Sequence, residues 1–169
     1  MLLKIGIRYS TEYGAVLDEA DLGKLDLPPY NADVEAAGIP AQVQAFNDRI
    51  RASDVILLAS PEYNYSVPGV LKNAIDWASR SGNAFACKHL ILCGASTGPY
   101  GTLRGQFQMR LLFTALNVVV LPQPQVLVPY AEQAFNNDGT LKDKKIDASF
   151  SQLIRETFAT AERAAGVTA

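Results

Sequence analysis

Short, almost continuous apolar runs alternate along the chain with longer segments in which apolar residues recur at helical spacing. Four such runs lie at residues 2–7, 55–59, 90–94 and 118–121. Because polar residues hardly interrupt them, these runs predict strands that are covered on both faces, as in a parallel sheet between two layers of helices.

The longer segments predict amphipathic helices. Apolar residues recur every three or four positions within residues 39–50, 70–78, 103–115 and 150–161, which places one apolar stripe on each helix. Pro68 suits the first turn of the second helix. Strands that alternate with helices in this way predict right-handed crossovers and a doubly wound α/β domain.

One region does not fit this alternation. Residues 15–22 have the apolar content of a second strand, but only residues 8–14 would join them to the first. Parallel neighbours need a crossover of about a dozen residues or more, usually with a helix. Either residues 15–22 are not a parallel strand, or the first crossover helix is missing.

Composition narrows the class of protein. A chain of 169 residues with 49% apolar and 19% charged residues predicts one folded domain over residues 1–169 and excludes a disordered chain. The net charge of −2 argues against a nucleic-acid partner. No apolar run approaches the roughly 20 residues that span a bilayer.

The chain has few histidine and cysteine residues that could bind a metal ion. The single histidine, His89, and the two cysteines, Cys87 and Cys93, are too few and too scattered for a metal site. The start of the chain does not have the pattern of a secretory peptide. We therefore expect a cytoplasmic protein in which both cysteines are reduced, buried thiols.

Three loops follow predicted strands, at residues 8–11, 60–69 and 94–101. In open α/β sheets, ligands bind outside the carboxyl ends of the strands. The middle loop carries two tyrosines ahead of a helix whose N-terminus suits an electron-rich heterocycle, although such a loop can also be a plain connection. The third loop has glycines that allow close approach to a ligand, but it is not a P-loop and can equally be a flexible connection.

Residues 61–80 read PEYNYSVPGVLKNAIDWASR. This long string resembles the signature of the NAD(P)H-dependent FMN reductase family, which includes quinone, azo-dye and chromate reductases. Shorter resemblances lie at residues 27–33, 95–98, 121–124 and 134–136. The resemblance implies a flavodoxin-like fold, with a doubly wound parallel sheet of five strands in three α/β/α layers.

The resemblance also implies which residues form the site. The isoalloxazine ring of FMN would be held, mostly through main chain, by Pro61, Glu62, Tyr63, Asn64 and Tyr65, with Ser96, Thr97 and Gly98 at its other edge. Tyr65 and Tyr100 would contact the substrate. Because the flavin carries the hydride, no side chain is expected to act as a catalytic acid or base.

The chain departs from the family pattern at the phosphate site. The family usually follows its first strand with a Gly-Ser-x-Arg-type loop and then a helix whose N-terminus meets the FMN phosphate. Here Ile7 is followed directly by Arg8-Tyr9-Ser10. We therefore expect the phosphate-loop-plus-helix crossover to be missing after Ile7, with Arg8 and Ser10 as the remaining candidates to bind the phosphate.

The function implied by the resemblance is an FMN-containing oxidoreductase that takes two electrons from NADPH or NADH and passes them to a quinone, free flavin, chromate or an azo dye. The alternatives are a flavodoxin-like electron carrier or sensor without nicotinamide turnover, and a domain that binds FMN poorly. Similar proteins form homodimers or homotetramers. The stripe of Leu103, Phe107 and Leu111 suits such an interface as well as the core.

Overall fold

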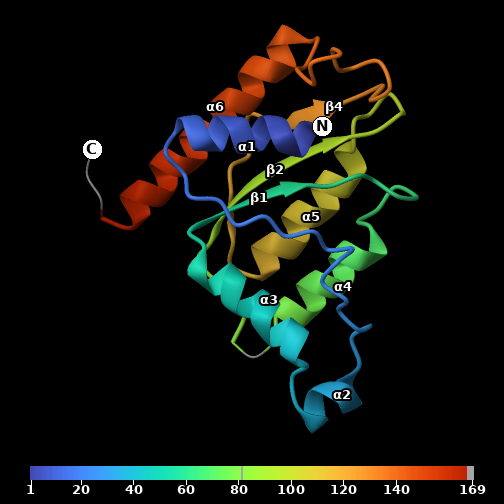
Figure 1. Cartoon of the computed structure of the whole chain (residues 1–169), viewed down its shortest axis with the longest axis vertical. Coiled ribbons are helices and arrows are strands. Elements are labelled where there is room, and N and C mark those ends of the chain that lie inside the picture. Colours follow the sequence, from blue (N-terminus) through green and yellow to red (C-terminus); the bar gives the residue numbers. More distant parts are fainter. Residues whose placement is uncertain (81, 167–169) are drawn as a thin grey trace.

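A parallel sheet of four strands lies between two layers of helices (Figure 1). The structure, a computed structural model, describes residues 1–80 and 82–166. The strands are β1 (Val55–Ala59), β2 (His89–Ala95), β3 (Val119–Val120) and β4 (Val126–Val128). β1 pairs with one side of β2, while β3 and β4 pair with the beginning and the end of its other side.

The described part of the chain forms six helices. They are α1 (Leu2–Glu12), α2 (Ala32–Ala37), α3 (Ala41–Ala52), α4 (Gly69–Ala78), α5 (Leu103–Ala115) and α6 (Lys144–Ala164). α1 and α6 lie on one face of the sheet, and α3, α4 and α5 lie on the other (Figure 1). The fold is therefore the three-layer α/β arrangement expected from the sequence.

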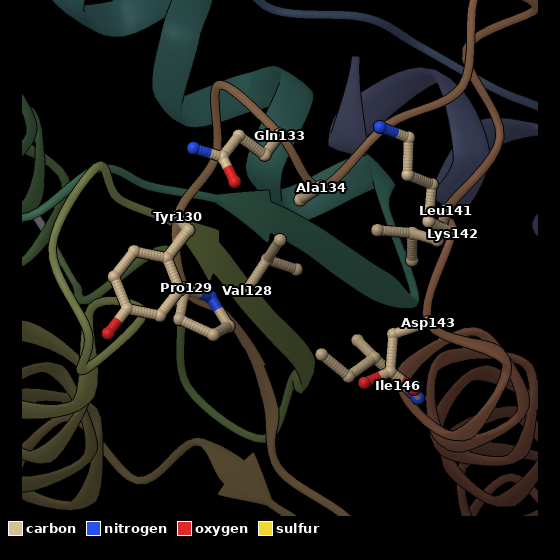
Figure 2. A pocket seen from close by; sticks show the side chains of 9 residues that line it. All are labelled: Val128, Pro129, Tyr130, Gln133, Ala134, Leu141, Lys142, Asp143 and Ile146. Carbon is tan, nitrogen blue, oxygen red and sulfur yellow. Dashed lines mark hydrogen bonds between the residues drawn. The ribbon is translucent and has the colours of Figure 1, made fainter.

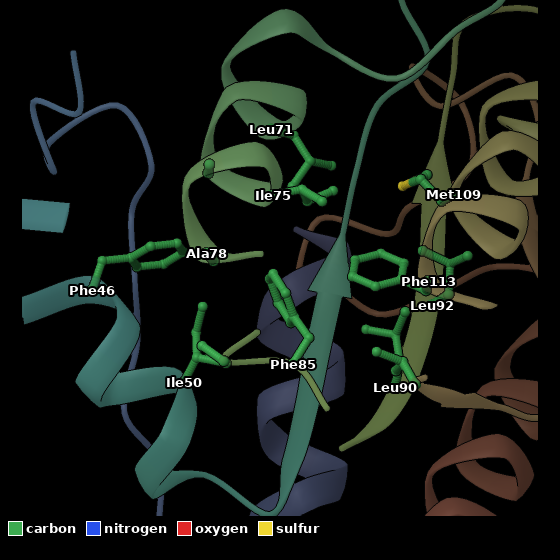
Figure 3. Close-up of a cluster of buried hydrophobic side chains, with 13 residues drawn as sticks. Phe46, Ile50, Leu71, Ile75, Ala78, Phe85, Leu90, Leu92, Met109 and Phe113 are labelled. Carbon is green, nitrogen blue, oxygen red and sulfur yellow. The ribbon is translucent and has the colours of Figure 1, made fainter. Parts of the chain in front are cut away.

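The central strand β2 divides its side chains between two hydrophobic cores. Leu90 and Leu92 pack with α3, α4 and α5, and Figure 3 shows them beside Met109 and Phe113 of α5. Ile91 belongs to the opposite core, with α1 and α6. Successive strand residues point to opposite faces, so an apolar run without polar alternation is what a strand covered on both faces requires.

The prediction of a strand at residues 2–7 is wrong, because this segment lies within the helix α1. Leu2 and Ile5 are buried against the sheet, and their spacing places them on one helix face. Gly6 lets the helix approach closely, since a Cβ there would stand 2.8 Å from side-chain atoms of both Leu57 and Phe150. Ile7 therefore lies inside a helix and does not end a strand. The expectation of a missing phosphate-loop-plus-helix crossover stays a prediction.

Residues 15–22 are not a strand, which resolves the first of the two alternatives raised by the sequence. They are mostly exposed and irregular. Arg49 of α3 holds them through a two-pronged ion pair with Asp18, at 2.6 and 2.8 Å, and a hydrogen bond to the Glu19 carbonyl. β4 was not predicted. The described residues thus form four strands in place of the five expected.

The other predicted elements are confirmed. α3 to α6 coincide with the four amphipathic segments, although Pro68 is the N-cap of α4 and does not lie inside its first turn. Cys93 is buried and burial raises its pKa to about 12. Cys87 is exposed, so the expectation that both thiols are buried is wrong for this one.

A loop after residue 27 is fastened to α4 by residues of the long signature string. The Pro28 carbonyl accepts hydrogen bonds from Trp77 Nε1 at 2.7 Å and from Asn73 Nδ2 at 2.9 Å. Asn73 Oδ1 in turn accepts the backbone N–H of Tyr30 at 2.8 Å. Part of the signature therefore has a structural role, which is to join the chain ahead of α2 to the helix that follows the middle loop.

His89, the only histidine, makes stability depend on pH in a predictable direction. Burial lowers its pKa from the ordinary 6.5, so the unfolded chain binds a proton more readily than the folded one as the pH falls below about 6.5. We expect the urea midpoint of unfolding to fall between about pH 7 and pH 5.5. His89→Gln should flatten this dependence, and an equal slope in both proteins would contradict the assignment.

Candidate functional site

Two predicted loops meet at the carboxyl edge of the sheet because the strands that precede them are parallel neighbours. β1 ends at Ala59 and β2 ends at Ala95, and Ala59 lies beside Cys93 in the register. The N–H of Ser60, which is buried, donates to the Cys93 carbonyl at 3.0 Å. The middle and third loops therefore leave the sheet side by side.

The middle loop is a tight hairpin turn at residues 63–66. Tyr63 and Ser66 exchange two backbone hydrogen bonds, at 3.1 and 2.9 Å. Asn64 and Tyr65 have positive φ angles of 49° and 63°, the left-handed pair that a type I′ turn requires. A tyrosine in this conformation is strained by roughly 1–3 kcal/mol and persists only where its surroundings hold it.

The beginning of α5 supplies the contacts that hold the turn. Glu62 accepts the N–H of Gly105 at 2.9 Å and a hydrogen bond from Arg104 Nη1 at 3.1 Å. Gln108 donates to the Tyr65 carbonyl at 2.9 Å and accepts from the Ser66 hydroxyl at 2.7 Å. Our sequence analysis missed Arg104 and Gln108; the signal that could have found them is their place in the first two turns of a helix that follows a Gly-rich loop.

The third loop is held from the other side by the chain that follows β4. The Ser96 N–H donates to the Val128 carbonyl at 3.0 Å, and the Tyr130 N–H donates to the Gly98 carbonyl at 3.2 Å. Gly101 has a left-handed φ of 53°, and a Cβ there would stand 2.8 Å from backbone atoms of Leu127 and Val128. This position therefore requires glycine, both for its φ and for the close approach of the two segments.

Both loops leave backbone donors for a ligand. Within the described residues, no hydrogen-bond partner is recorded for the N–H groups of Asn64, Tyr65, Thr97 and Gly98. The pyrimidine part of an isoalloxazine ring carries carbonyl oxygens and ring nitrogens that accept hydrogen bonds. These donors are chemically suited to such a ring, and the assignment of the predicted site residues to FMN stays a prediction.

Three tyrosines are exposed around these donors. Tyr63, Tyr65 and Tyr100 are 61%, 66% and 54% exposed, so their rings cover no core and are available to a planar molecule. This exposure and the open donors favour a ligand site over the alternative that the loops are plain connections.

The structure places Arg8 and Ser10 within α1 and not in a loop. Arg8 forms an exposed ion pair with Glu12 at 3.9 Å. Ser10 is 2% exposed and its hydroxyl has no partner among the residues described. The expectation of a loop here is wrong because the segment is helical, and the burial of Ser10 gives it no access to a phosphate in this conformation.

A cavity of about 270 Å³ lies beside the third loop, at the carboxyl end of β4. Figure 2 shows Val128, Leu141 and Ile146 among its lining side chains, with Tyr130 and Gln133 also around it. None of the predicted site residues lines it. The segment at residues 128–130 lines this cavity and also forms backbone hydrogen bonds with the third loop.

The described residues contain no cluster of three or more side chains that could hold a metal ion. In the same part of the chain, no helix combines the length and the apolar character needed to cross a bilayer.

Three layers of α/β structure, with two loops side by side at the carboxyl edge of the sheet, are typical of the flavodoxin-like class of proteins. The model of the NADPH-dependent FMN reductase family matches residues 3–133. The chain belongs to this family, as the signature string indicated.

Individual relatives agree with this assignment. An NAD(P)H-dependent FMN reductase of Pseudomonas aeruginosa is 45% identical over 133 residues, covering 78% of this chain and 71% of the relative. A probable NADPH:quinone oxidoreductase of Oryza sativa is 36% identical over 156 residues, covering 90% and 75%. The solved structure of FerB, a flavoenzyme NAD(P)H:(acceptor) oxidoreductase of Paracoccus denitrificans, superposes with a TM-score of 0.83 at 30% identity, covering 96% of this chain and 88% of FerB.

Gly94 tests how closely the strand end and the two loops must approach. A Cβ at this position would stand 2.2 Å from Thr102 Oγ1 and 2.5 Å from the Ser60 carbonyl oxygen. We expect Gly94→Ala to lower the free energy of unfolding by roughly 1–3 kcal/mol, because backbone and buried side chain must both shift. Gly98→Ala is the control, since nothing lies within 4 Å of its Cβ position. Equal urea midpoints for the two variants would contradict the close approach.

Proposed function

We propose that this chain holds FMN across the carboxyl edge of its sheet, uses NADPH or NADH as the electron donor, and reduces quinones, free flavin or a similar planar acceptor. The observation that carries the proposal is the pairing of an α5-anchored hairpin with a Gly-rich loop, both with open backbone donors, in a chain of the NADPH-dependent FMN reductase family. Chromate and azo dyes are further acceptors of the same proposal.

Bound FMN would supply the two-electron chemistry, and the protein supplies orientation and electrostatics. The N–H groups of Asn64, Tyr65, Thr97 and Gly98 would donate to the ring edge that becomes electron-rich on reduction. The N-terminus of α4, which follows the hairpin at Gly69, adds the positive pole of a helix on the same side. Donors fixed in this way would favour the reduced state of bound FMN over its oxidised state.

No side chain is needed to move a proton in this scheme. Glu62 is engaged by Arg104 and by the backbone of Gly105. The nearby thiol of Cys93 is buried, and its pKa of about 12 keeps it protonated. Tyr63, Tyr65 and Tyr100 would instead bind the nicotinamide and the acceptor in turn, by stacking and apolar contact.

The decisive test is the behaviour of the flavin absorbance band. We expect the purified protein, after addition of FMN and removal of the excess, to be yellow, to bleach when NADPH or NADH is added without oxygen, and to regain its colour with a quinone. A yellow protein that does not bleach would favour the electron carrier without nicotinamide turnover. A colourless protein that retains no FMN would favour the remaining alternative, a domain that binds FMN poorly.

We also propose that the chain forms a homodimer or homotetramer through the outer face of α5. Phe107 and Leu111 lie one helical turn apart and are 57% and 75% exposed, so this stripe does not serve the core. Large apolar side chains grouped on one face mark interaction surfaces. The two free thiols suit the reducing cytoplasm that we propose as its location.

Leu111→Glu tests the proposed interface. A charge placed in an apolar interface must be desolvated without a partner, so we expect the variant to be monomeric where the wild type is not. The measurement is molar mass by light scattering after size-exclusion chromatography. Val16→Glu is the control, since Val16 is fully exposed on the irregular segment before α2. A monomeric wild type would overturn the proposal.

A further inference from the structure

Arg104 lies where three segments of the site converge. Its guanidinium stands over the ring of Tyr65 at 3.9 Å and over the ring of Tyr100 at 4.4 Å. The same group reaches Glu62 at 3.1 Å. Tyr65 and Glu62 belong to the hairpin loop and Tyr100 to the Gly-rich loop, while Arg104 itself is the second residue of α5.

The Glu62 carboxylate is paired on both of its oxygens. Its side chain is only 9% exposed, and both oxygens have partners, the Gly105 N–H and the Arg104 guanidinium. A carboxylate so far removed from water is stable only when it is paired and hydrogen-bonded. Glu62 therefore fixes the position of the hairpin against α5, and its side chain is not left to contact a ligand.

Arg104 also sets how the two tyrosines are placed relative to each other. Among the described residues, neither Tyr65 nor Tyr100 has another ring contact or a side-chain hydrogen bond, and both residues are more than half exposed. A planar guanidinium close to both rings restricts rotation of each side chain. Tyr65 is in addition a residue in a left-handed conformation, which needs external support.

We propose that Arg104 is the positioning residue of this site, which couples the hairpin to the Gly-rich loop and sets the placement of Tyr65 and Tyr100 for the acceptor. The proposal deepens the proposed function and rests on it where the acceptor is concerned. Arg104 does this through two separable contacts. The first is the ion pair with Glu62, and the second is the stacking of the planar guanidinium on the rings of Tyr65 and Tyr100. Lysine can replace the first contact but not the second.

The first measurement needs no cofactor. Amide hydrogen exchange, resolved by residue in the FMN-free protein, reports on the backbone bonds of Tyr63, Ser66 and Leu103. We expect Arg104→Met to speed exchange at these amides about tenfold, which is the loss of interactions of ordinary cation–π and ion-pair strength. The Gly139 amide, in a distant turn, should not change. Arg49→Met, which breaks an ion pair on α3, is the matched control and should leave all three site amides unchanged.

The second measurement separates positioning from general damage. In the FMN-loaded protein, we expect Arg104→Met to raise the KM for a quinone about tenfold with a smaller change in kcat. Arg104→Lys should restore the exchange rate at Tyr63 and Ser66 but not the KM. If Arg104→Met does not fold, the lysine variant alone still tests the split between the two contacts.

The outcomes can be told apart. Unchanged exchange and unchanged KM in Arg104→Met would overturn the inference, and so would full rescue of KM by lysine, because stacking would then not matter. A wild type that binds no FMN would refute the proposed function, while the exchange measurement would still decide whether Arg104 couples the two loops.

Discussion

The rest of the structure depends on the pairing of β2 with each of the strands β1, β3 and β4. β1 pairs with one side of it, and β3 and β4 pair with the other. Its first six residues are buried, and the side chains of residues 90–93 alternate between the two cores. The two helix layers therefore pack on opposite faces of this strand. The carboxyl ends of β1 and β2 are held at the same edge of the sheet.

This edge places two loops side by side, but the edge alone does not give either loop its shape. The hairpin contains a strained Tyr65. It is stabilised by two hydrogen bonds with α5, from the Gly105 N–H to Glu62 and from Gln108 to the Tyr65 carbonyl. The Gly-rich loop is stabilised by the segment after β4. The backbone donors that would face a flavin are thus oriented by elements up to about 40 positions away in the chain, which is how a rigid scaffold positions functional loops.

The comparison with the sequence-based expectations is most instructive at residues 2–7. A short apolar run fits a buried strand and a buried helix equally well, and the order of the elements argued for a strand. The helix forms because Leu2 and Ile5 share one face, and because Gly6 allows that face to lie against Leu57. The same error made Arg8 and Ser10 appear to follow a strand, whereas both lie inside α1.

By itself, the sequence determined the α/β class and, through the string at residues 61–80, the family. It also determined four of the six helices and three of the four strands that the described residues form. These features follow from local periodicity and from contiguous residues, which one sequence displays directly. Only the tertiary structure revealed the contacts of Arg104 with two tyrosines and the exposure of Phe107 and Leu111. The physical reason is that packing between elements decides two things that one sequence does not display. These are the partner that a side chain meets from about 40 positions away in the chain, and the face of a helix that is exposed to water.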